Sequence, residues 1–233
     1  LKKYLAHNDE VRVFVLDATN MVSKLRDLHG MTNVVTAAVG RTLVISTIMA
    51  EKLKEKTDRL TVQIKGEGPI GNIVVCGNNE LEMKAYVSNP TVELDKKENG
   101  KLDVASAVGK GYINVIKDIG LKKPYNGVCK LISSEIAEDF AYYFVTSEQT
   151  PCAVFLGVNF SKDNKVAKAC GYVIEPLPNA SEQVISILES INSRIDSVTN
   201  LMIDLDDIDD VAKTITGDNN IKCIEEKTPI LKC

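Results

Sequence analysis

Histidine and aromatic residues are scarce in this sequence, and tryptophan is absent. Aromatic residues make up 5% of the 233 residues, and there are two histidines. A core must therefore rest on Val, Ile, Leu and Ala, although the hydrophobic fraction of 44% is ordinary for a globular protein. Neither His7 nor His29 stands at the spacing of a metal site or a catalytic triad. Nothing in the sequence therefore marks a histidine-dependent active site.

A surplus of positive charge and a secretion signal are also lacking. The net charge is −4 and the pI is near 5.4, whereas a nucleic-acid-binding protein needs a concentrated basic face. Residues 1–10 contain no apolar stretch of signal length. The apolar run over residues 34–50 is interrupted by Arg41 and is short for a bilayer span. We therefore expect a buried core helix there, with no nucleic acid and no membrane as partners.

The six cysteines are far apart and form no close pair: they are Cys76, Cys129, Cys152, Cys170, Cys223 and Cys233. A secreted disulfide scaffold would be shorter and denser in cysteine. We therefore expect a cytoplasmic protein, in which most of these thiols pack as small apolar side chains. A nucleotide site is not indicated either, because Gly66-Glu-Gly-Pro69 lacks a Gly-Lys-Ser/Thr ending and leads into a strand.

Alternating and helical periodicities divide the chain into strands and helices. Strands are predicted over residues 11–16, 59–65, 70–76, 81–87, 112–116, 125–132, 153–158 and 166–174. Helices are predicted from Asp17 to His29, from Thr32 or Asn33 to about Thr57, over 104–108, and over 135–148 with Ser133 or Ser134 as the cap. Because the strands come in runs broken by helices, without βαβ regularity, the sequence predicts the α+β class.

The composition changes after Pro176 and Pro178, which mark a linker. Ser181 starts a further helix whose apolar face holds Val184, Ile187, Leu188, Ile191 and Ile195. Residues 196–210 then contain six Asp and no Lys or Arg, together with several large apolar residues. We expect this acidic and apolar segment to dock on the main domain and to loosen readily, because its charges repel one another.

Several short segments, taken in order, carry a resemblance to a known family. They are Leu60-Thr-Val-Gln-Ile-Lys-Gly-Glu-Gly-Pro69, Gly77-Asn-Asn79, Val108-Gly-Lys-Gly-Tyr112, Glu138-Asp-Phe-Ala-Tyr-Tyr-Phe144, Ser147-Glu-Gln-Thr-Pro151 and Ala169-Cys-Gly-Tyr172, the last leading to Pro176. In this order and spacing, across most of the chain, they resemble the redox-regulated thirty-three-kilodalton heat-shock chaperones.

The resemblance implies a layered β/β/α core with a curved mixed sheet, followed by a helical linker region. It also implies an ATP-independent holdase, not an enzyme, which binds unfolding proteins under oxidative and heat stress. The family binds zinc through a Cys-x-Cys pair and a Cys-x-x-Cys pair, and Cys233 matches the first of these four. Oxidation of such thiolates to disulfides releases zinc and unfolds the module. The other three ligands are not in these 233 residues, so we expect no zinc in this chain.

By the same resemblance, residues 1–178 form the chaperone core, 179–228 the acidic helical linker and 229–233 the start of the zinc-binding redox switch. The apolar face from Val184 to Ile195 is the candidate client-binding or linker interface. The expected partners are unfolded client proteins and, in the active state, a second copy in a homodimer. Cys76, Cys129, Cys152, Cys170 and Cys223 fall outside the switch motif.

Two other functions stay open from the residues alone. A cytosolic enzyme that uses a carboxylate pair or a cysteine predicts a deep pocket with convergent polar groups. An adaptor domain predicts a fixed apolar patch with a polar rim. A holdase predicts instead a broad apolar surface that is covered in the resting state.

Overall fold

The computed structural model describes residues 1–205 and 207–232, which form two β-sheets. The first sheet is antiparallel, with the strand order β10-β1-β2-β9-β8. The second sheet has the order β11-β5-β4-β3-β6-β7 and is mixed, because β11 runs parallel to β5. The strands of the first sheet are β1 (Lys2–Ala6), β2 (Val11–Asp17), β8 (Ala153–Phe160), β9 (Val166–Pro176) and β10 (Lys222–Glu226). Those of the second are β3 (Arg59–Gly66), β4 (Asn72–Gly77), β5 (Glu82–Val87), β6 (Gly111–Asp118), β7 (Tyr125–Lys130) and β11 (Ile230–Leu231).

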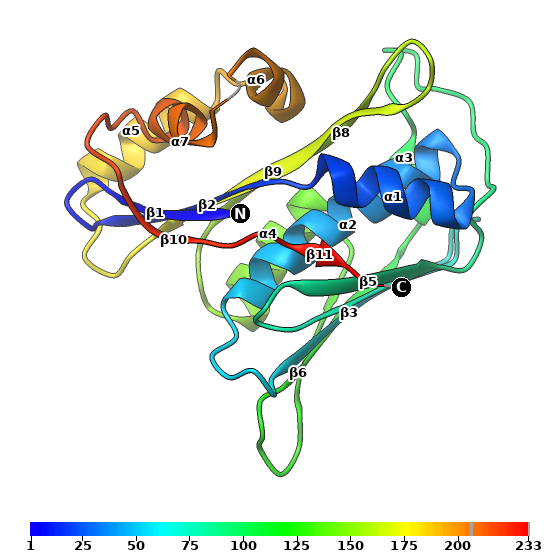
Figure 1. Cartoon of the computed structure of the whole chain (residues 1–233), viewed down its shortest axis with the longest axis horizontal. Helices are drawn as coiled ribbons and strands as arrows, with labels where there is room; N and C mark the ends of the chain where they lie inside the picture. The colour runs from blue at the N-terminus through cyan, green and yellow to red at the C-terminus, as the bar shows by residue number, and fades with distance from the viewer. Residues whose placement is uncertain (206, 233) are drawn as a thin grey trace.

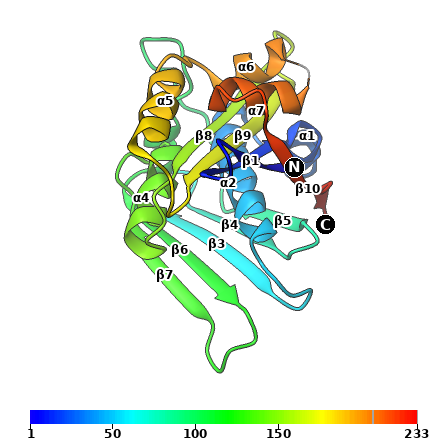
Figure 2. The ribbon, with the colours of Figure 1, turned by 90° about the vertical axis from the view of Figure 1, so that its left-hand side faces the viewer.

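The helices form two layers, one between the sheets and one outside them (Figures 1 and 2). Helix α2 (Asn33–Glu51) lies between the sheets, with α1 (Thr19–His29), α3 (Val104–Val108) and α4 (Ala137–Ser147) around it. Helices α5 (Glu182–Asn192), α6 (Val198–Asp204) and α7 (Ile208–Thr216) cover the other face of the first sheet. The predicted α+β class is confirmed, and the structure adds that a helical layer separates the two sheets.

Helix α2 is buried along nearly its whole length, as its apolar composition predicts. Among the described residues, α2 is the one helix whose length and apolar composition would allow it to cross a membrane. Its side chains, however, pack inside the protein. Its threonine hydroxyls need no partner outside the helix. Those of Thr36, Thr42 and Thr47 donate to carbonyls four residues earlier, at 2.7, 2.8 and 2.7 Å.

The predicted end of this helix near Thr57 is wrong, because α2 ends at Glu51. The Asp58 carboxylate accepts hydrogen bonds from the backbone N–H groups of Lys54 and Glu55, at 3.1 and 3.0 Å. These bonds favour a turn over further helix, although the intervening Glu and Lys residues are good helix formers.

Of three further local predictions about helices, one is confirmed and two are wrong. Helix α1 ends as expected, with Gly30 in the left-handed conformation at φ 62°. Leu28, which the helical spacing places with the buried residues of α1, is 54% exposed. The predicted serine caps of α4 are wrong, because the helix begins at Ala137 and the Asp139 carboxylate binds the preceding backbone N–H groups instead.

Strand β2 is apolar at nearly every position because both faces of the first sheet are buried. Phe14 and Leu16 face the main core around α2, whereas Val11, Val13 and Val15 face the outer helices. Strands β1 and β10 have no counterpart among the predicted elements. They extend the sheet beyond β2 and place the N-terminal strand beside a strand from near the end of the chain (Figure 1).

Candidate functional site: a covered apolar face of the first sheet

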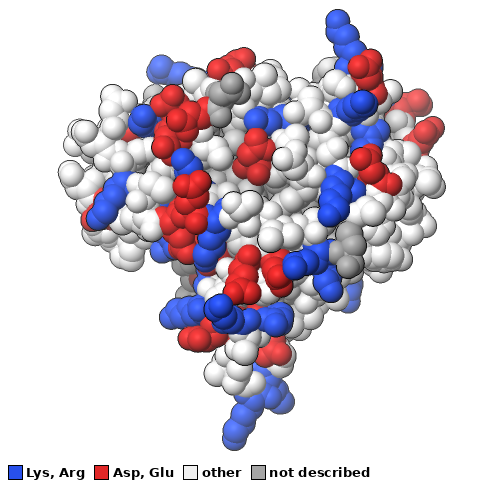
Figure 3. Space-filling model, viewed as in Figure 1, with Lys and Arg blue, Asp and Glu red and all other residues white. Residues whose placement is uncertain are grey.

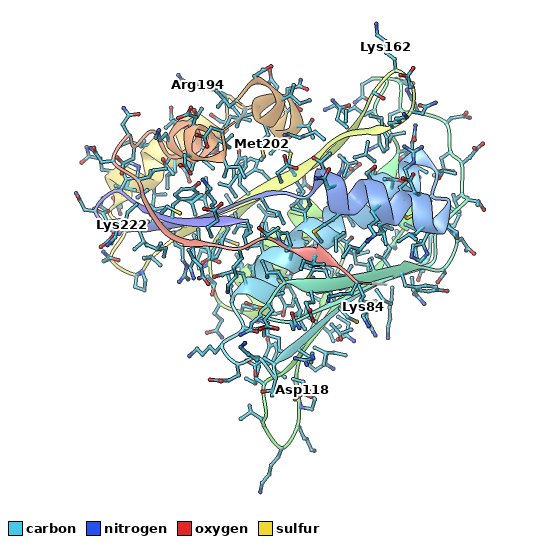
Figure 4. The ribbon with its side chains drawn as sticks, in the orientation of Figure 1. Lys84, Asp118, Lys162, Arg194, Met202 and Lys222 are labelled. Carbon is cyan, nitrogen blue, oxygen red and sulfur yellow. The ribbon has the colours of Figure 1, made fainter. Side chains whose placement is uncertain are left out.

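The outer face of the first sheet is apolar and lies beneath α5–α7. We call this surface the covered face; its sheet residues are Tyr4, Ala6, Val11, Val13, Val15, Cys170, Tyr172 and Ile174, all buried. The helices that cover it contribute Val184, Leu188, Val198, Met202, Val211, Ala212 and Ile215. Met202 lies between α6 and the sheet (Figure 4). Since burial of one such side chain contributes about 1.5–3 kcal/mol, lifting the helices would expose a strongly hydrophobic surface.

The structure divides the predicted apolar face of the linker into three parts. Val184 and Leu188 are buried in the covered face. Ile191 and Ile195 are half-buried, and Ile195 packs at its margin. Ile187 is 37% exposed. Whether this set forms the client or linker interface stays a prediction. The third helix of the cover formed by α5–α7, helix α7, contributes Val211, Ala212 and Ile215, which sequence reasoning did not place there.

One buried asparagine links two of the covering helices to the sheet. The Tyr172 hydroxyl donates to Asn192 Oδ1 at 3.0 Å. Asn192 Nδ2 in turn donates to the carbonyls of Leu188 and Ile215, at 2.8 and 3.0 Å. All polar atoms of this side chain are thus engaged between β9, α5 and α7. No pattern in the sequence singles out Asn192, because an isolated Asn near a helix end is ordinarily exposed.

Two glycines lie where the covering helices pack closely, one between α6 and strand β8 and one between α7 and α5. A Cβ atom on Gly157 of β8 would lie 2.6 Å from Thr199 Cγ2 and 2.7 Å from Val198 Cγ1. A Cβ atom on Gly217, at the end of α7, would lie 2.5 Å from Ile191 Cδ1, and this residue has φ 69°. A side chain at position 157 would therefore push α6 away from β8, and one at position 217 would displace the end of the Ile191 side chain and strain the left-handed backbone.

Polar contacts fix the rim of the covered face. Asp209 at the start of α7 binds Lys2 Nζ at 2.8 Å and accepts a hydrogen bond from the Tyr4 hydroxyl. His7 Nε2 donates to the Thr216 carbonyl at 2.9 Å. These contacts join the β1–β2 hairpin to both ends of α7. They are partly exposed and weak individually, so the apolar contacts supply most of the docking energy.

Acid is expected to loosen α7. The hydrogen bonds from Lys2 and Tyr4 hold the pKa of Asp209 below its ordinary value of 3.8. A lowered carboxyl pKa stabilises the folded state fully above the ordinary value, and this stabilisation is lost as the pH falls through the folded-state value. Below about pH 4, hydrogen exchange at the amides of α7 should therefore accelerate before global unfolding. Asp209→Asn should accelerate this exchange already at neutral pH.

The control for this experiment is Asp210→Asn. Within the part of the chain that the structure describes, Asp210 forms an ion pair with Lys213 of its own helix, at 2.9 Å, and none with the sheet. Its replacement should leave the neutral exchange rates of α7 unchanged. Equal effects of the two substitutions would show that helix charge, and not docking to β1, controls the opening.

The cysteines in the described residues are dispersed and mostly shielded. Burial raises the pKa of Cys129 to about 11 and the pKa values of Cys152 and Cys170 to about 12. Cys76 is half-buried and Cys223 is exposed. Within residues 1–205 and 207–232, no three His, Cys, Asp or Glu side chains come together as metal ligands. The predicted zinc ligand Cys233 lies outside the described residues, so its role as a zinc ligand stays a prediction.

Comparison with known proteins gives one consistent result. The model of the Hsp33 protein family matches residues 1–233. A 33 kDa chaperonin of Clostridioides difficile is 48% identical over 84% of this chain and 67% of its own length. One from Desulforamulus reducens is 39% identical over 100% of this chain and 79% of its own.

A solved structure agrees with this result. The crystal structure of the 33 kDa chaperonin (heat shock protein 33 homolog) from Thermotoga maritima has a TM-score of 0.89 and 32% identity, and the match covers 99% of this chain and 79% of that one. The family match spans the covered face, the helices above it and both sheets. The chain therefore belongs to the Hsp33 family of stress-response chaperones.

Proposed function

We propose that this protein is a redox-regulated, ATP-independent holdase which binds unfolding proteins and prevents their aggregation. The observation that carries the proposal is the covered face: an apolar surface of the first sheet that is closed by helices α5, α6 and α7. Family membership makes it a chaperone that binds unfolded clients. The covered face supports the finer statement, because a holdase needs an apolar surface that is shut at rest and opened under stress.

Helices α5–α7, which together we call the cover, have properties that would let them detach from the sheet under stress. Helices α5, α6 and α7 are short, and short helices gain most of their stability from packing. Acidic residues crowd the region from Asp204 to Asp210, so loss of a few contacts would let the segment repel itself from the sheet. We include in the proposal a core of residues 1–178, a releasable segment of 179–228, and dimerisation of the open form.

The redox element of the proposal rests on Cys233. By family resemblance it is the first of four zinc-binding cysteines, with residues 229–233 opening the switch module. Cys233 follows β11 in the sequence, and α7, β10 and β11 follow one another along the chain with short connections, which supports control of the cover from this end. Disturbance at Cys233 would reach the cover through these strands.

Peroxide is expected to leave client binding by this 233-residue chain unchanged. The chain supplies one cysteine of the switch, and the thiols of Cys129, Cys152 and Cys170, which are buried or half-buried, have raised pKa values that keep them protonated and slow to oxidise. Binding measured before and after peroxide, with Cys233→Ser as the control, tests this. A response that persists in Cys233→Ser would assign sensing to another thiol, Cys223 being the exposed one.

The function itself is tested by light scattering from a heat-unfolding test protein, with this chain added and ATP absent. Suppressed scattering at near-stoichiometric amounts would support a client surface within these residues. No suppression by the chain, and none by a variant with the cover opened, would overturn the proposal. Enzyme and adaptor functions gain no support from the comparisons, since the relatives are named as chaperonins.

A further inference from the structure

Strand β10 is an edge strand with almost no side-chain anchorage. It pairs antiparallel with β1, from Lys2 opposite Glu226 to Leu5 opposite Lys222. Four of its five residues are exposed, including Ile224, and the remaining one is half-buried. Charged residues flank its path across the surface (Figure 3). The strand is therefore attached mainly through its backbone.

Strand β1, by contrast, is held in place by buried side chains and by its pairing with β2. Tyr4 and Ala6 are buried in the covered face, and β1 pairs with β2 over its whole length. If β10 departs, β1 becomes the edge strand and leaves a row of backbone N–H and C=O groups without partners. This row borders the covered face, because the residue opposite Tyr4 projects to the same side of the sheet as Tyr4.

The remaining contacts of β10 are polar. Lys3 Nζ lies 2.9 Å from the buried Glu51 carboxylate and 3.2 Å from that of Glu225. Lys227 Nζ lies 2.6 Å from Glu225. Hydrogen bonding with Glu51, Lys227 and Lys3 holds the pKa of Glu225 at about 2. Since β10 follows α7 after a short connection (Figure 1), lifting α7 would leave β10 attached on that side to a segment that is no longer docked.

We propose that the edge of β1, vacated by β10 when the cover opens, binds an extended segment of an unfolding polypeptide by antiparallel strand addition. The inference deepens the proposed function and rests on it. The structure itself shows that this edge accepts an added strand with few side-chain requirements, since β10 occupies it with exposed side chains.

This mode of binding suits unfolded clients as a class. Backbone hydrogen bonds are available in every extended segment, whatever its sequence. A client strand at this edge would also direct alternate side chains to the same side of the sheet as Tyr4 and the valines of β2, which are exposed once the cover opens. Segments with apolar residues at every second position would therefore bind best, because the edge and the covered face would act together.

A reversible disulfide between β1 and β10 tests the proposal. Leu1 and Lys227 exchange both backbone hydrogen bonds, each at 2.9 Å, so Lys2 and Glu226 form the next, non-hydrogen-bonded pair, whose side chains approach closely. The variant carries Lys2→Cys and Glu226→Cys, with Cys223→Ser and Cys233→Ser to prevent other pairing. Leu188→Asp is added to lift the helices. The same protein is then locked when oxidised and open when reduced.

The probe is fluorescently labelled α-lactalbumin, reduced and carboxymethylated so that it stays unfolded, with binding followed by anisotropy. The reduced variant should bind at least about tenfold more tightly than the oxidised one, a difference of about 1.4 kcal/mol. The matched control, with Lys2→Ser and Glu226→Ser in the same background, should bind equally in both conditions.

Three results would overturn the inference, and they differ in meaning. Equal, tight binding by the locked and open forms would leave the holdase proposal standing and remove the edge from it. Absence of binding by both forms and by the control would remove the holdase proposal and the inference with it. Dimerisation of the open form by sedimentation, with a dimer that excludes the probe, would assign the edge to β10 of a second copy.

A second probe isolates the backbone contribution. A short peptide of alternating Val and Lys should compete with the labelled client for the open variant. Methylation of alternate backbone nitrogens in one register should abolish competition, and methylation in the other register should leave it intact, because only one edge of the added strand faces β1. Equal competition by both methylated peptides would show that apolar side chains alone are recognised.

Discussion

Replacing Leu188 with Asp is expected to open the cover and to convert the resting chain into one that binds clients. Leu188 is 6% exposed and packs in the covered face. The substitution removes about 1.5–3 kcal/mol of burial and places a charge in an apolar setting without a partner. Because α5–α7 are one layer of the fold, this loss should open them while the two sheets stay folded. Suppression of aggregation should rise at least about tenfold, the ratio that corresponds to about 1.4 kcal/mol.

The control lies one residue away. Ile187 on the same helix is 37% exposed, so Ile187→Asp places the same charge on the outer side and should leave client binding close to that of the parent. Circular dichroism and hydrogen exchange would confirm that the sheets of both variants remain folded. If Leu188→Asp folds, exposes α5–α7 to exchange and still binds no more client than the parent, the covered face is not the client surface.

Replacing Asp139 with Ala is expected to cause a large loss of global stability. The Asp139 carboxylate is fully buried and accepts backbone hydrogen bonds from Ile132, Ser133, Ser134 and Ile136, at 2.7, 2.8, 3.1 and 2.9 Å. Hydrogen bonds to a charged group each contribute about 1.5–3 kcal/mol, and buried donors left without partners add a penalty. Denaturant unfolding should therefore show a decrease of at least about 3 kcal/mol in the free energy of unfolding.

Glu138→Ala provides the comparison for this prediction. Glu138 is the exposed neighbour of Asp139 in the first turn of α4, and its removal should change the free energy of unfolding by less than about 1 kcal/mol, mainly through the helix dipole. A loss in Asp139→Ala as small as that in Glu138→Ala would mean that water replaces the carboxylate at the four N–H groups.

Most strands and helices could be predicted because their own side chains carry the pattern. The alternation of Leu60, Val62 and Ile64 reflects one buried face of the second sheet, and it gives β3 correctly. Val184 and Leu188 are buried at the helical spacing that the sequence shows. Ile187 and Leu28 follow the same spacing but lie at the outer edges of their helices, because an apolar stripe indicates a direction and not its limits.

Elements held by distant parts of the chain could not be predicted. Strand β1 reads Lys-Lys-Tyr-Leu-Ala and becomes a strand only between β2 and β10. Strand β10 has exposed side chains, so no alternation marks it. The capping role of Asp139 was missed because two nearby serines fit the common capping pattern, whereas a carboxylate that folds back to four N–H groups has no sequence signature.

The pairing of β1 with β10 also sets the order in which a newly made chain can fold. Leu1 and Lys227, which bond to each other, are 226 residues apart, and long-range strand pairing is slow because it closes a large loop. During synthesis, β1, β2, β8 and β9 leave the ribosome before α5, α6, α7 and β10. The apolar face is therefore complete before its cover exists, and every nascent molecule passes through an uncovered state that is prone to self-association.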